Sequence, residues 1–319
     1  MRAATDSGVL SQPAATTASL ASVGAKAATL ARLAAQGIPV PDFSVVSSAA
    51  FARHLEESRI PWPAGGVTDA RQWTIVRERI HDSSVGTALS GQILAGYERL
   101  CQISGHDRVA ARSSGSEEDS QLASFAGQFD TILNVDGSTV VASVKECWAS
   151  YFSERSLEYR EANCIPFGLS PTFGVIIQAQ VFSQRAGVMF TVHPLDASQP
   201  VLYLEANYGT GESVVGGLAT PDSVTAPRSG HGVVEIVTGT KRRMTTLSLD
   251  SRGSQIVDVE ESMRRSPVLT ERDVRELSQM GLHIEQLMKG PQDIEWAYDS
   301  HQLWILQARP ITGLGKTSV

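Results

Sequence analysis

The chain has 319 residues, of which 42% are hydrophobic and 19% are charged, and its mean hydropathy is −0.08. These values are typical of a globular protein with one large domain or two modest ones. The formal net charge of −7 argues against a nucleic-acid-binding protein, because such proteins carry a basic surface. No run approaches the roughly 18 uninterrupted apolar residues that a membrane span requires.

The cysteines and the N-terminal segment indicate the compartment. Cys101, Cys147 and Cys164 lie far apart and are odd in number, which favours reduced thiols over disulfides or a zinc site. Residues 1–20 are rich in Ala, Ser and Thr and lack the apolar core of a secretory signal. We therefore expect a cytoplasmic location.

The first half of the sequence is rich in helical patterns. Leu30 and Leu33 lie on one face of an alanine-rich segment, and Gly37 stands where a left-handed helix C-cap would fall. Val144, Trp148 and other apolar residues near them recur at helical spacing. The patterns predict helices at 24–36, from 47 onward, in parts of 74–102 and at 138–162, with strands at 109–111 and 129–135.

The second half is rich in strand patterns. A helix is predicted to begin at Thr270, where Thr270 and Asp273 resemble a capping box, and to end at Gly290. Apolar runs bounded by Gly, Pro or Asp predict strands at 172–182, 186–192 and 201–207, a meander to about 259 and a final hairpin at 291–312. Helices and strands are mixed without strict βαβ alternation, which predicts an α+β fold. We expect two lobes, 1–180 and 181–319.

Two features of the N-terminal half could bind anions. The predicted loop from Arg112 to Ser116 combines a guanidinium, hydroxyls and a glycine, which can hold a phosphate. The alternative is a solvated loop in which Arg112 pairs with the acidic residues 117–119. Lys26 stands at a helix start, where a cation is unfavourable unless an anion is present, although an exposed lysine also explains it. The segment 124–128 could form a mobile cover over a ligand.

The final segment, 291–312, contains two apolar runs that flank a polar turn, and Glu295, Gln307 and Arg309 interrupt these runs. With a three-residue turn at 300–302, Glu295 lies opposite Gln307 on the neighbouring strand. Buried strands seldom contain such residues unless they are paired or functional.

The positions of these three side chains suggest a metal and phosphate site. Gln307 and Arg309 are two residues apart, so we expect them on one strand face together with Leu303 and Ile305. The oxygens of Glu295 and Gln307 suit Mg²⁺, and Arg309 could neutralise a transferring phosphoryl group. The alternative is a buried salt bridge between Glu295 and Arg309.

Taken in order, several stretches resemble the nucleotide-binding domain shared by phosphoenolpyruvate synthase, pyruvate phosphate dikinase and rifampicin phosphotransferase. They are VGAKAATLARLAAQGIPVPDF, VAARSSGSEEDSQLASFAGQFDTILNV, AGVMFTVHP, YGTGESVVGG with TPD, and PQDIEWAYDSHQLWILQARPIT, and they span about residues 23 to 312. The resemblance implies an ATP-grasp fold with ATP held in the cleft between the two lobes.

The same resemblance implies roles for individual residues. ATP phosphates would contact Lys26 and Arg112, and the covering segment would contain Gly127 and Thr131. The remaining implied ligands are Gln178, Gln180 and Val181 in the hinge beside adenine, Glu212 near the ribose, Glu295 and Gln307 at Mg²⁺, and Arg309 at the transferred phosphate. Lys26, Arg112 and Arg309 would be the catalytic residues.

Members of the resembled family cleave ATP to AMP and phosphate and pass the β-phosphoryl group to a histidine on a mobile domain. This sequence ends seven residues after Thr312, and the motif of the phosphohistidine domain is absent from it. Smaller departures are His193 in TVHP and Gln180 in the hinge, where the family often has methionine.

Three functions fit these observations. The first is an ATP- and Mg²⁺-dependent phosphotransferase domain whose phosphoryl acceptor, a histidine, is on a separate protein or a missing domain. The second is a free-standing ATP-grasp kinase or activating enzyme that phosphorylates a small molecule directly. The third is a non-catalytic nucleotide-sensing module, which would not need Glu295, Gln307 and Arg309 together.

Overall fold

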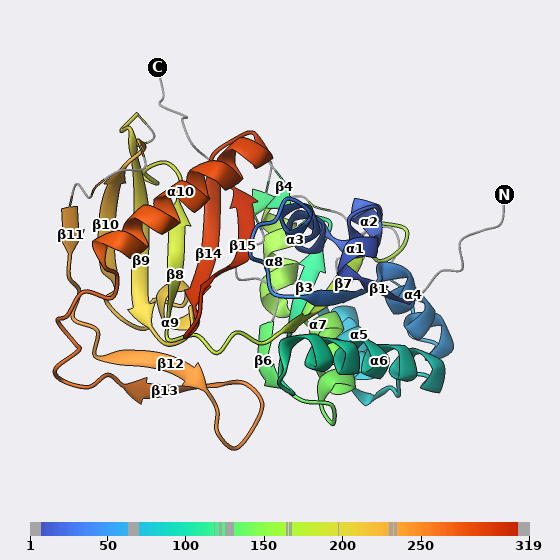
Figure 1. The fold of residues 1–319 in the computed structure, drawn as a ribbon. Coiled ribbons are helices and arrows are strands. Elements are labelled where there is room, and N and C mark those ends of the chain that lie inside the picture. Colours follow the sequence, from blue (N-terminus) through green and yellow to red (C-terminus); the bar gives the residue numbers. More distant parts are fainter. Residues whose placement is uncertain are drawn as a thin grey trace. The chain divides into compact units, whose positions relative to one another are not determined.

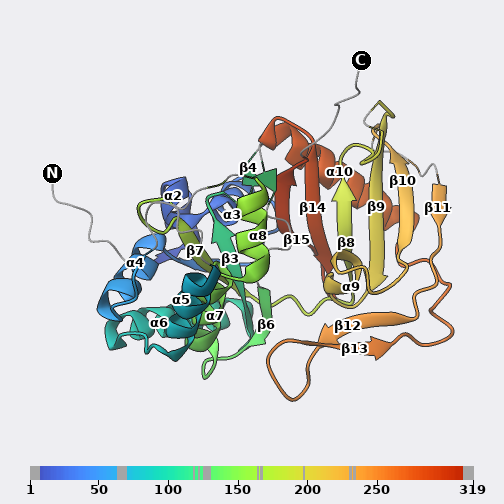
Figure 2. The ribbon, with the colours of Figure 1, turned by 180° about the vertical axis from the view of Figure 1, so that it is seen from behind.

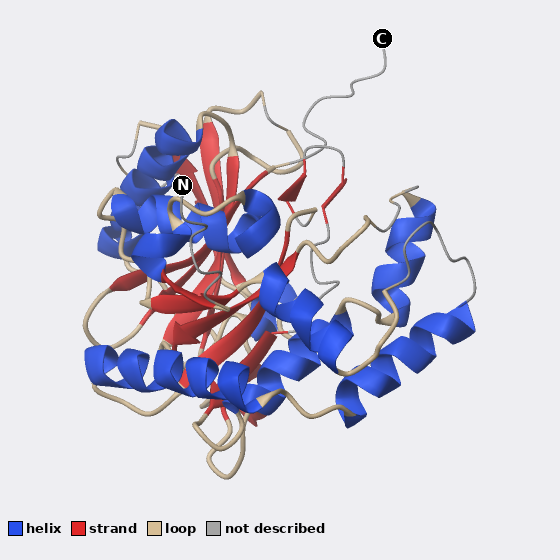
Figure 3. Ribbon diagram, turned by 90° about the vertical axis from the view of Figure 1, so that its right-hand side faces the viewer, coloured by secondary structure: helices blue, strands red, loops and turns tan. Residues whose placement is uncertain are grey.

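The computed structural model describes residues 8–62, 70–117, 119–120, 123–124, 131–163, 165, 168–196, 198–229, 232 and 235–311. The chain divides into two compact units (Figure 1). The N-terminal unit comprises Met1–Ala35, Asp42–Gln180 and Asp250–Gly253, and the C-terminal unit comprises Gln36–Pro41, Val181–Leu249 and Ser254–Val319. Each unit combines helices with antiparallel sheets, which confirms the predicted α+β class (Figure 3).

The N-terminal unit is built on a five-stranded sheet with the order β1-β2-β7-β3-β6. Its strands are β1 (Val9–Ser11), β2 (Phe43–Val46), β3 (Val109–Gly115), β6 (Thr131–Val135) and β7 (Phe173–Ala179), and β4 (Asp119–Ser120) pairs separately with β5 (Ala123–Ser124). Its helices are α1 (Gln12–Ala15), α2 (Leu20–Val23), α3 (Ala25–Ala35), α4 (Ser48–Glu57), α5 (Ala70–Asp82), α6 (Thr87–Ser104), α7 (Val140–Ser150) and α8 (Glu154–Ala162).

The main core of this unit lies on one face of the sheet. Because side chains alternate along a strand, Val109 and Ala111 of β3 and Val175 of β7 face the same side. They are buried in one apolar cluster with side chains of α4, α5, α6 and α7, among which Phe51 and Trp148 stack with centroids 5.0 Å apart. The alternate residues of β3 and β7 therefore point to the other face.

Two predicted elements of this unit were wrong. The segment predicted as one helix over 138–162 is two helices, because Ser153 caps a new one by accepting a hydrogen bond from the Ser156 amide. The strand predicted at 109–111 continues to Gly115, so Arg112 lies within a strand and not in a loop. Hydrogen bonding of β3 to both β6 and β7 explains the longer strand.

The C-terminal unit is built on a six-stranded sheet with the order β11-β10-β9-β8-β14-β15. Its strands are β8 (Arg185–Phe190), β9 (Val201–Tyr208), β10 (Asp222–Pro227), β11 (Glu235–Val237), β14 (Gln292–Tyr298) and β15 (Leu303–Pro310), and β12 (Arg243–Leu247) pairs with β13 (Ser254–Asp258) as a separate hairpin. Its helices are α9 (Glu212–Val215) and α10 (Glu271–Met288).

Helix α10 covers one face of this sheet (Figures 1 and 2). It begins at the predicted capping box, in which Thr270 and Asp273 each accept a hydrogen bond from the other's backbone amide. Gly281 allows close packing, since a Cβ there would lie 2.6 Å from Met189 Cε. Because Met189 points towards α10, its neighbours Val188 and Phe190 on β8 point to the opposite face.

Candidate active site

The N-terminal unit places three of the predicted nucleotide-site residues, Arg112, Thr131 and Gln178, on one face of its sheet. Arg112 lies opposite Thr131 on β6 and opposite Ile176 on β7, so its side chain points away from the main core. Arg112 and Gln178 are buried on this face, and Arg112 Nη1 donates a hydrogen bond of 3.0 Å to Gln178 Oε1. Glu117, an expected alternative partner of Arg112, pairs with Arg160.

Lys26 lies at the start of α3, which packs on the same face. The Ala27 amide donates to Ser114 Oγ at 3.0 Å, and a Cβ on Gly24 would lie 1.9 Å from the Ser114 carbonyl oxygen. Gly24 has φ +81°, a conformation that favours glycine. The helix start is therefore held two residues along β3 from Arg112. Lys26 is 5% exposed and Arg112 is 6% exposed, so both cations are withdrawn from bulk water.

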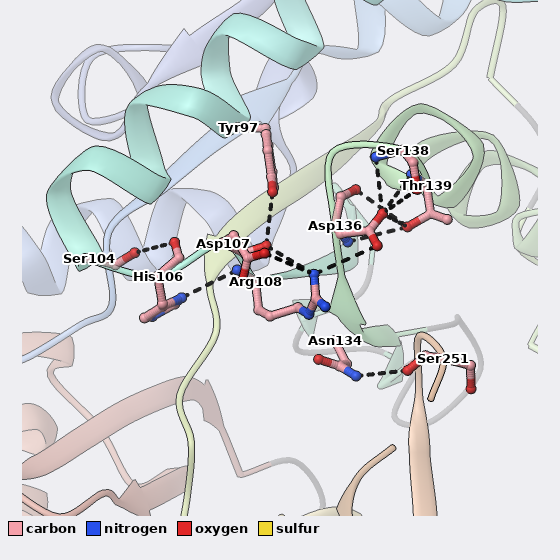
Figure 4. Close-up of polar contacts among 10 residues, drawn as sticks. All are labelled: Tyr97, Ser104, His106, Asp107, Arg108, Asn134, Asp136, Ser138, Thr139 and Ser251. Atoms are coloured by element: carbon pink, nitrogen blue, oxygen red, sulfur yellow. Dashed lines mark hydrogen bonds and ion pairs between the residues drawn. The ribbon is translucent and has the colours of Figure 1, made fainter. Parts of the chain in front are cut away.

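Gln180, a predicted hinge residue, is fixed within the N-terminal unit. Its amide donates to the Arg108 carbonyl at 3.1 Å, and its Oε1 accepts from the Asn134 amide at 3.0 Å. Asn134 has φ +56°, and its Nδ2 donates to the Ser251 carbonyl at 2.7 Å (Figure 4). Arg108, whose backbone carbonyl accepts from Gln180, lies close to the carboxylates of Asp107 and Asp136, as the same view shows.

In the C-terminal unit, Glu295 lies opposite Gln307, as predicted, but the turn is not the one expected. Tyr298 pairs with Leu303, so four residues, 299–302, form the connection. A regular ladder from that turn would place Glu295 opposite residue 306. A β-bulge adds one residue to β15 between Ile305 and Gln307, which restores the pairing of Glu295 with Gln307.

Because of the bulge, the side chains of β15 are divided between the two sheet faces differently from the prediction. Leu303 and Ile305 pair with Tyr298 and Trp296, whereas Gln307 pairs with Glu295. Neighbouring residues of β14 point to opposite faces, so Gln307 does not share a face with Leu303 and Ile305. The prediction that they share one face was wrong, because it assumed uninterrupted alternation.

Arg309 lies opposite Asp293, a residue that the sequence reasoning missed. Arg309 donates to Asp293 Oδ2 from Nε at 2.9 Å and from Nη2 at 2.6 Å. Asp293 is two residues from Glu295 and shares its face, so the alternation argument applied to Glu295 could have found it. Burial raises the pKa of Asp293, Arg309 opposes that rise, and Glu295 adds to it.

An apolar cluster adjoins these polar residues. Ala186 of β8 lies opposite Ala297 of β14, and both are buried. Ala297 is two residues after Glu295, so it points to the same face of the sheet. Val181 joins them, with Trp304 and Leu306 packed alongside. Leu306 is the bulge residue, so the bulge that aligns the polar pair also contributes to this apolar surface.

Glu212, the predicted ribose ligand, begins the short helix α9. Its Oε2 accepts a hydrogen bond of 3.3 Å from Thr210 Oγ1, which in turn lies 2.7 Å from Thr245 Oγ1. Gly209 approaches the same strand β12, where a Cβ would meet the Thr245 carbonyl oxygen at 2.1 Å. Gly127 lies outside the described residues.

A family model for the pyruvate phosphate dikinase AMP/ATP-binding domain matches residues 20–319. The chain belongs to this family. It is 34% identical over 307 residues to a probable phosphoenolpyruvate synthase of Methanocaldococcus jannaschii, covering 92% of this chain and 26% of that protein. It is 36% identical over 309 residues to a probable phosphoenolpyruvate synthase of Methanothermobacter thermautotrophicus, covering 92% and 44%.

Another relative is named as a rifampicin phosphotransferase. The chain is 34% identical over 310 residues to a rifampicin phosphotransferase of a Streptomyces species, covering 93% of this chain and 35% of that protein. The chain thus spans less than half the length of these relatives. Among solved structures, the D-alanine-D-alanine ligase of Coxiella burnetii matches 92% of this chain and 49% of its own with 11% identity and a TM-score of 0.35.

Membership of this family accords with the resemblance seen in the sequence motifs. Within the described part of the chain, no group of three or more His, Cys, Asp or Glu side chains forms a metal site. A cation at Glu295 and Gln307 would therefore need other oxygens to complete its coordination. No helix among the described residues is long and apolar enough to cross a membrane.

Proposed function

We propose that this chain is an ATP-grasp domain that binds ATP with Mg²⁺ and passes a phosphoryl group to an acceptor. The observation that carries the proposal is the order of side chains on one face of the C-terminal sheet. Along the β14–β15 ladder, an apolar position at Ala297 is followed by Glu295 with Gln307, and then by Asp293 with Arg309. This order suits a nucleotide that has an apolar base at one end and phosphates at the other.

The apolar cluster beside Ala297 supports the assignment of the adenine base to this part of the sheet face. A purine ring is flat and apolar on its faces, and binding sites for such rings are lined mostly by apolar side chains with a few polar groups. Val181, Ala186, Ala297, Trp304 and Leu306 supply this kind of surface. The backbone beside Val181 and the carboxylate of Glu212 would supply the polar contacts to adenine and ribose.

Two buried cations of the N-terminal unit support the assignment of phosphate-binding residues. Lys26 and Arg112 are both buried on one face of the N-terminal sheet, where desolvated cations favour an anionic ligand. The amide groups at the start of α3 add partial positive charge beside Lys26. We assign Lys26 and Arg112 to the ATP phosphates, Arg309 to the transferred phosphoryl group, and Thr131 and Gly127 to the segment that covers the nucleotide.

The residues present fit Mg²⁺. Glu295 and Gln307 offer two oxygen donors from directly opposed positions, and Asp293 Oδ1 is a buried acceptor with no hydrogen-bond partner in the described structure. Mg²⁺ in kinase and ATPase sites takes one or two carboxylates and completes its shell with substrate phosphates and water. When bound, it would neutralise charge that develops on the transferred group.

For the acceptor, we propose a histidine on another protein or on a domain outside this sequence. The relatives are longer than this chain and include phosphoenolpyruvate synthases, which supports an acceptor outside the nucleotide-binding part. A small molecule phosphorylated directly is the second candidate, because one relative is a rifampicin phosphotransferase. A purely sensing module is disfavoured by the presence of the full set Glu295, Gln307 and Arg309. A cytoplasmic location stays a prediction.

The products of ATP turnover test the proposal. The purified protein is incubated with ATP and Mg²⁺, with free imidazole in place of the histidine acceptor, and the nucleotides are separated by chromatography. AMP indicates dikinase chemistry, and ADP indicates a simple kinase. We expect Glu295→Ala to abolish turnover and the exposed-site control Glu235→Gln to leave it unchanged. Unchanged turnover in Glu295→Ala would contradict the proposal.

A further inference from the structure

Glu205 lies on the same face of the C-terminal sheet as the proposed metal residues. It pairs with Val188 of β8, and Val188 pairs with Glu295, which pairs with Gln307. Directly opposed residues in neighbouring strands point to one face, so Glu205, Glu295 and Gln307 stand in one row. Two strand spacings of about 4.8 Å separate the backbones of the two glutamates, with the short Val188 side chain between them.

Tyr203 orients this carboxylate. Its hydroxyl donates a hydrogen bond of 3.2 Å to Glu205 Oε1. Burial raises the pKa of Tyr203 and Glu205 raises it further, so the hydroxyl keeps its proton and remains the donor. Tyr203 also lies in the next row of the same face, in line with Phe190, Asp293 and Arg309.

The surface formed by Glu205 and Tyr203 accepts hydrogen bonds and carries negative charge. Within the described structure, the only side-chain hydrogen bond of Glu205 comes from Tyr203, and no ion pair forms with it. An imidazole lies beside this surface: the centroid of the His193 ring is 5.4 Å from that of Tyr203, and His193 Nδ1 accepts a hydrogen bond from the Leu195 amide. A carboxylate in this position suits a ligand with an N–H group and repels an anion.

A second carboxylate on this face, that of Asp293, has one oxygen without a hydrogen-bond donor among the described residues. Asp293 is 8% exposed, and its Oδ1 has no hydrogen-bond partner among the described residues. Buried polar atoms are nearly always hydrogen-bonded, so an unpartnered one indicates a missing ligand, ion or water. The nucleotide proposed above would lie over β14 and β15, which leaves Glu205 and Tyr203, on β9, free for the acceptor.

Resting on the proposed function, we propose that Glu205, oriented by Tyr203, positions an imidazole-class phosphoryl acceptor. Its carboxylate accepts the N–H of the ring while the other ring nitrogen attacks phosphorus. An N–P bond forms, the P–O bond to the nucleotide breaks, and the electron pair leaves on the nucleotide oxygen. The ring N–H stays on its nitrogen, and the carboxylate stabilises the positive charge that develops on the ring. Carboxylate acceptors are disfavoured by repulsion.

Free imidazole and acetate serve as the acceptor probes. The protein is incubated with ATP, Mg²⁺ and either probe, and phosphoimidazole and acetyl phosphate are measured by ³¹P NMR. We expect phosphoimidazole to form and acetyl phosphate to be absent. Glu205→Gln should lower the imidazole-dependent rate by about tenfold or more while KM for ATP changes less than about twofold, since a hydrogen bond to a charged group is lost. Tyr203→Phe should give a smaller loss.

The controls separate this inference from the proposed function. Glu205→Asp keeps the charge and should restore part of the rate, whereas the exposed Glu235→Gln should behave as the original protein. Equal rates for Glu205→Gln and the original protein would overturn the role of Glu205. So would ATP binding without any transfer to imidazole, or equal transfer to acetate. If the original protein fails to bind ATP, the proposed function itself is wrong.

Discussion

Arg309 donates two hydrogen bonds to the same oxygen of Asp293, from Nε and from Nη2, across the β14–β15 ladder. The second oxygen of Asp293 is buried and has no hydrogen-bond partner in the described structure. The guanidinium is thus held by one carboxylate oxygen, and an unused acceptor stands beside it. The next opposed pair on the same face of these strands, two residues further along each strand, is Glu295 with Gln307.

Replacing Asp293 tests whether this pair positions Arg309. Asp293→Asn keeps the shape but removes the charge that holds the guanidinium, so we expect kcat for ATP turnover to fall roughly 10- to 100-fold, as for loss of a charge-assisted hydrogen bond. KM for ATP should change little. The exposed Asp258→Asn is the control. Steady-state kinetics with equal kcat for Asp293→Asn and the original protein would refute the positioning role.

Gly24 lets the start of α3 approach β3. In Gly24→Ala, the new Cβ would meet the Ser114 carbonyl at 1.9 Å, which must displace the helix start that carries Lys26. We expect weaker ATP binding and a lower melting temperature. Gly37→Ala is a matched control, because Gly37 has a similar φ of +77° but no atom within 4 Å of the added Cβ. It should lower stability slightly through strain and leave ATP affinity unchanged. Equal affinities in both variants would contradict the placement of Lys26 at the phosphates.

Arg112 combines charge with a planar fork that also contacts Gln178. Arg112→Lys keeps the charge but loses the fork, and we expect KM for ATP to rise about tenfold. Gln178→Leu, which removes the side-chain amide that accepts from Arg112 and leaves the guanidinium in place, should cause a smaller rise. Binding of a fluorescent ATP analogue gives an independent measure. A lysine variant with unchanged ATP affinity would show that the phosphate contact is made elsewhere.

Lys241 and Asp222 form an ion pair of 2.5 Å that is almost completely buried in the C-terminal unit. Asp222 also accepts hydrogen bonds from the amides of Gly239 and Val268, so it joins three segments of the chain. Lys241→Met leaves the carboxylate without its cation and should lower the free energy of unfolding by about 3–5 kcal/mol. The double variant with Asp222→Asn should recover part of this loss. Urea denaturation that shows a loss below about 1 kcal/mol would argue against the role of this pair.

His54 makes stability depend on pH. It is buried, stacks on Trp148, and lies 2.9 Å from Ser83 Oγ, and burial followed by the charge of Lys145 lowers its pKa from 6.5 to about 4. Between these values the unfolded chain binds more protons than the folded protein, so the free energy of unfolding falls as pH drops from 6.5 to 4. The slope for one such group is at most about 1.4 kcal/mol per pH unit. His54→Gln should flatten urea midpoints measured across this range.

The shared face of Arg112 and Gln178 is explained by simple alternation, but the partners of each strand are not. The sequence patterns predict strands close to Arg112 and Gln178 but place Arg112 in a loop, which was wrong. The non-local pairing of β3 with β7 and β6 extends the strand and brings Arg112 to Gln178 and Thr131. Such contacts join segments far apart in the chain, so no local pattern reveals them.

The final hairpin shows the same division between local and tertiary information. The pattern of residues alone shows that Glu295 and Gln307 interrupt two apolar strands, and charged and amide side chains seldom occur in such strands without a partner or a function. How the two side chains meet depends on the folded hairpin. Its four-residue turn shifts the strand register by one residue from the expected one, and the bulge at Leu306 shifts it back, so that Glu295 faces Gln307. The bulge residue Leu306 packs against an apolar cluster that includes residues from distant segments of the chain, so the hydrophobic pattern within one strand does not encode the bulge.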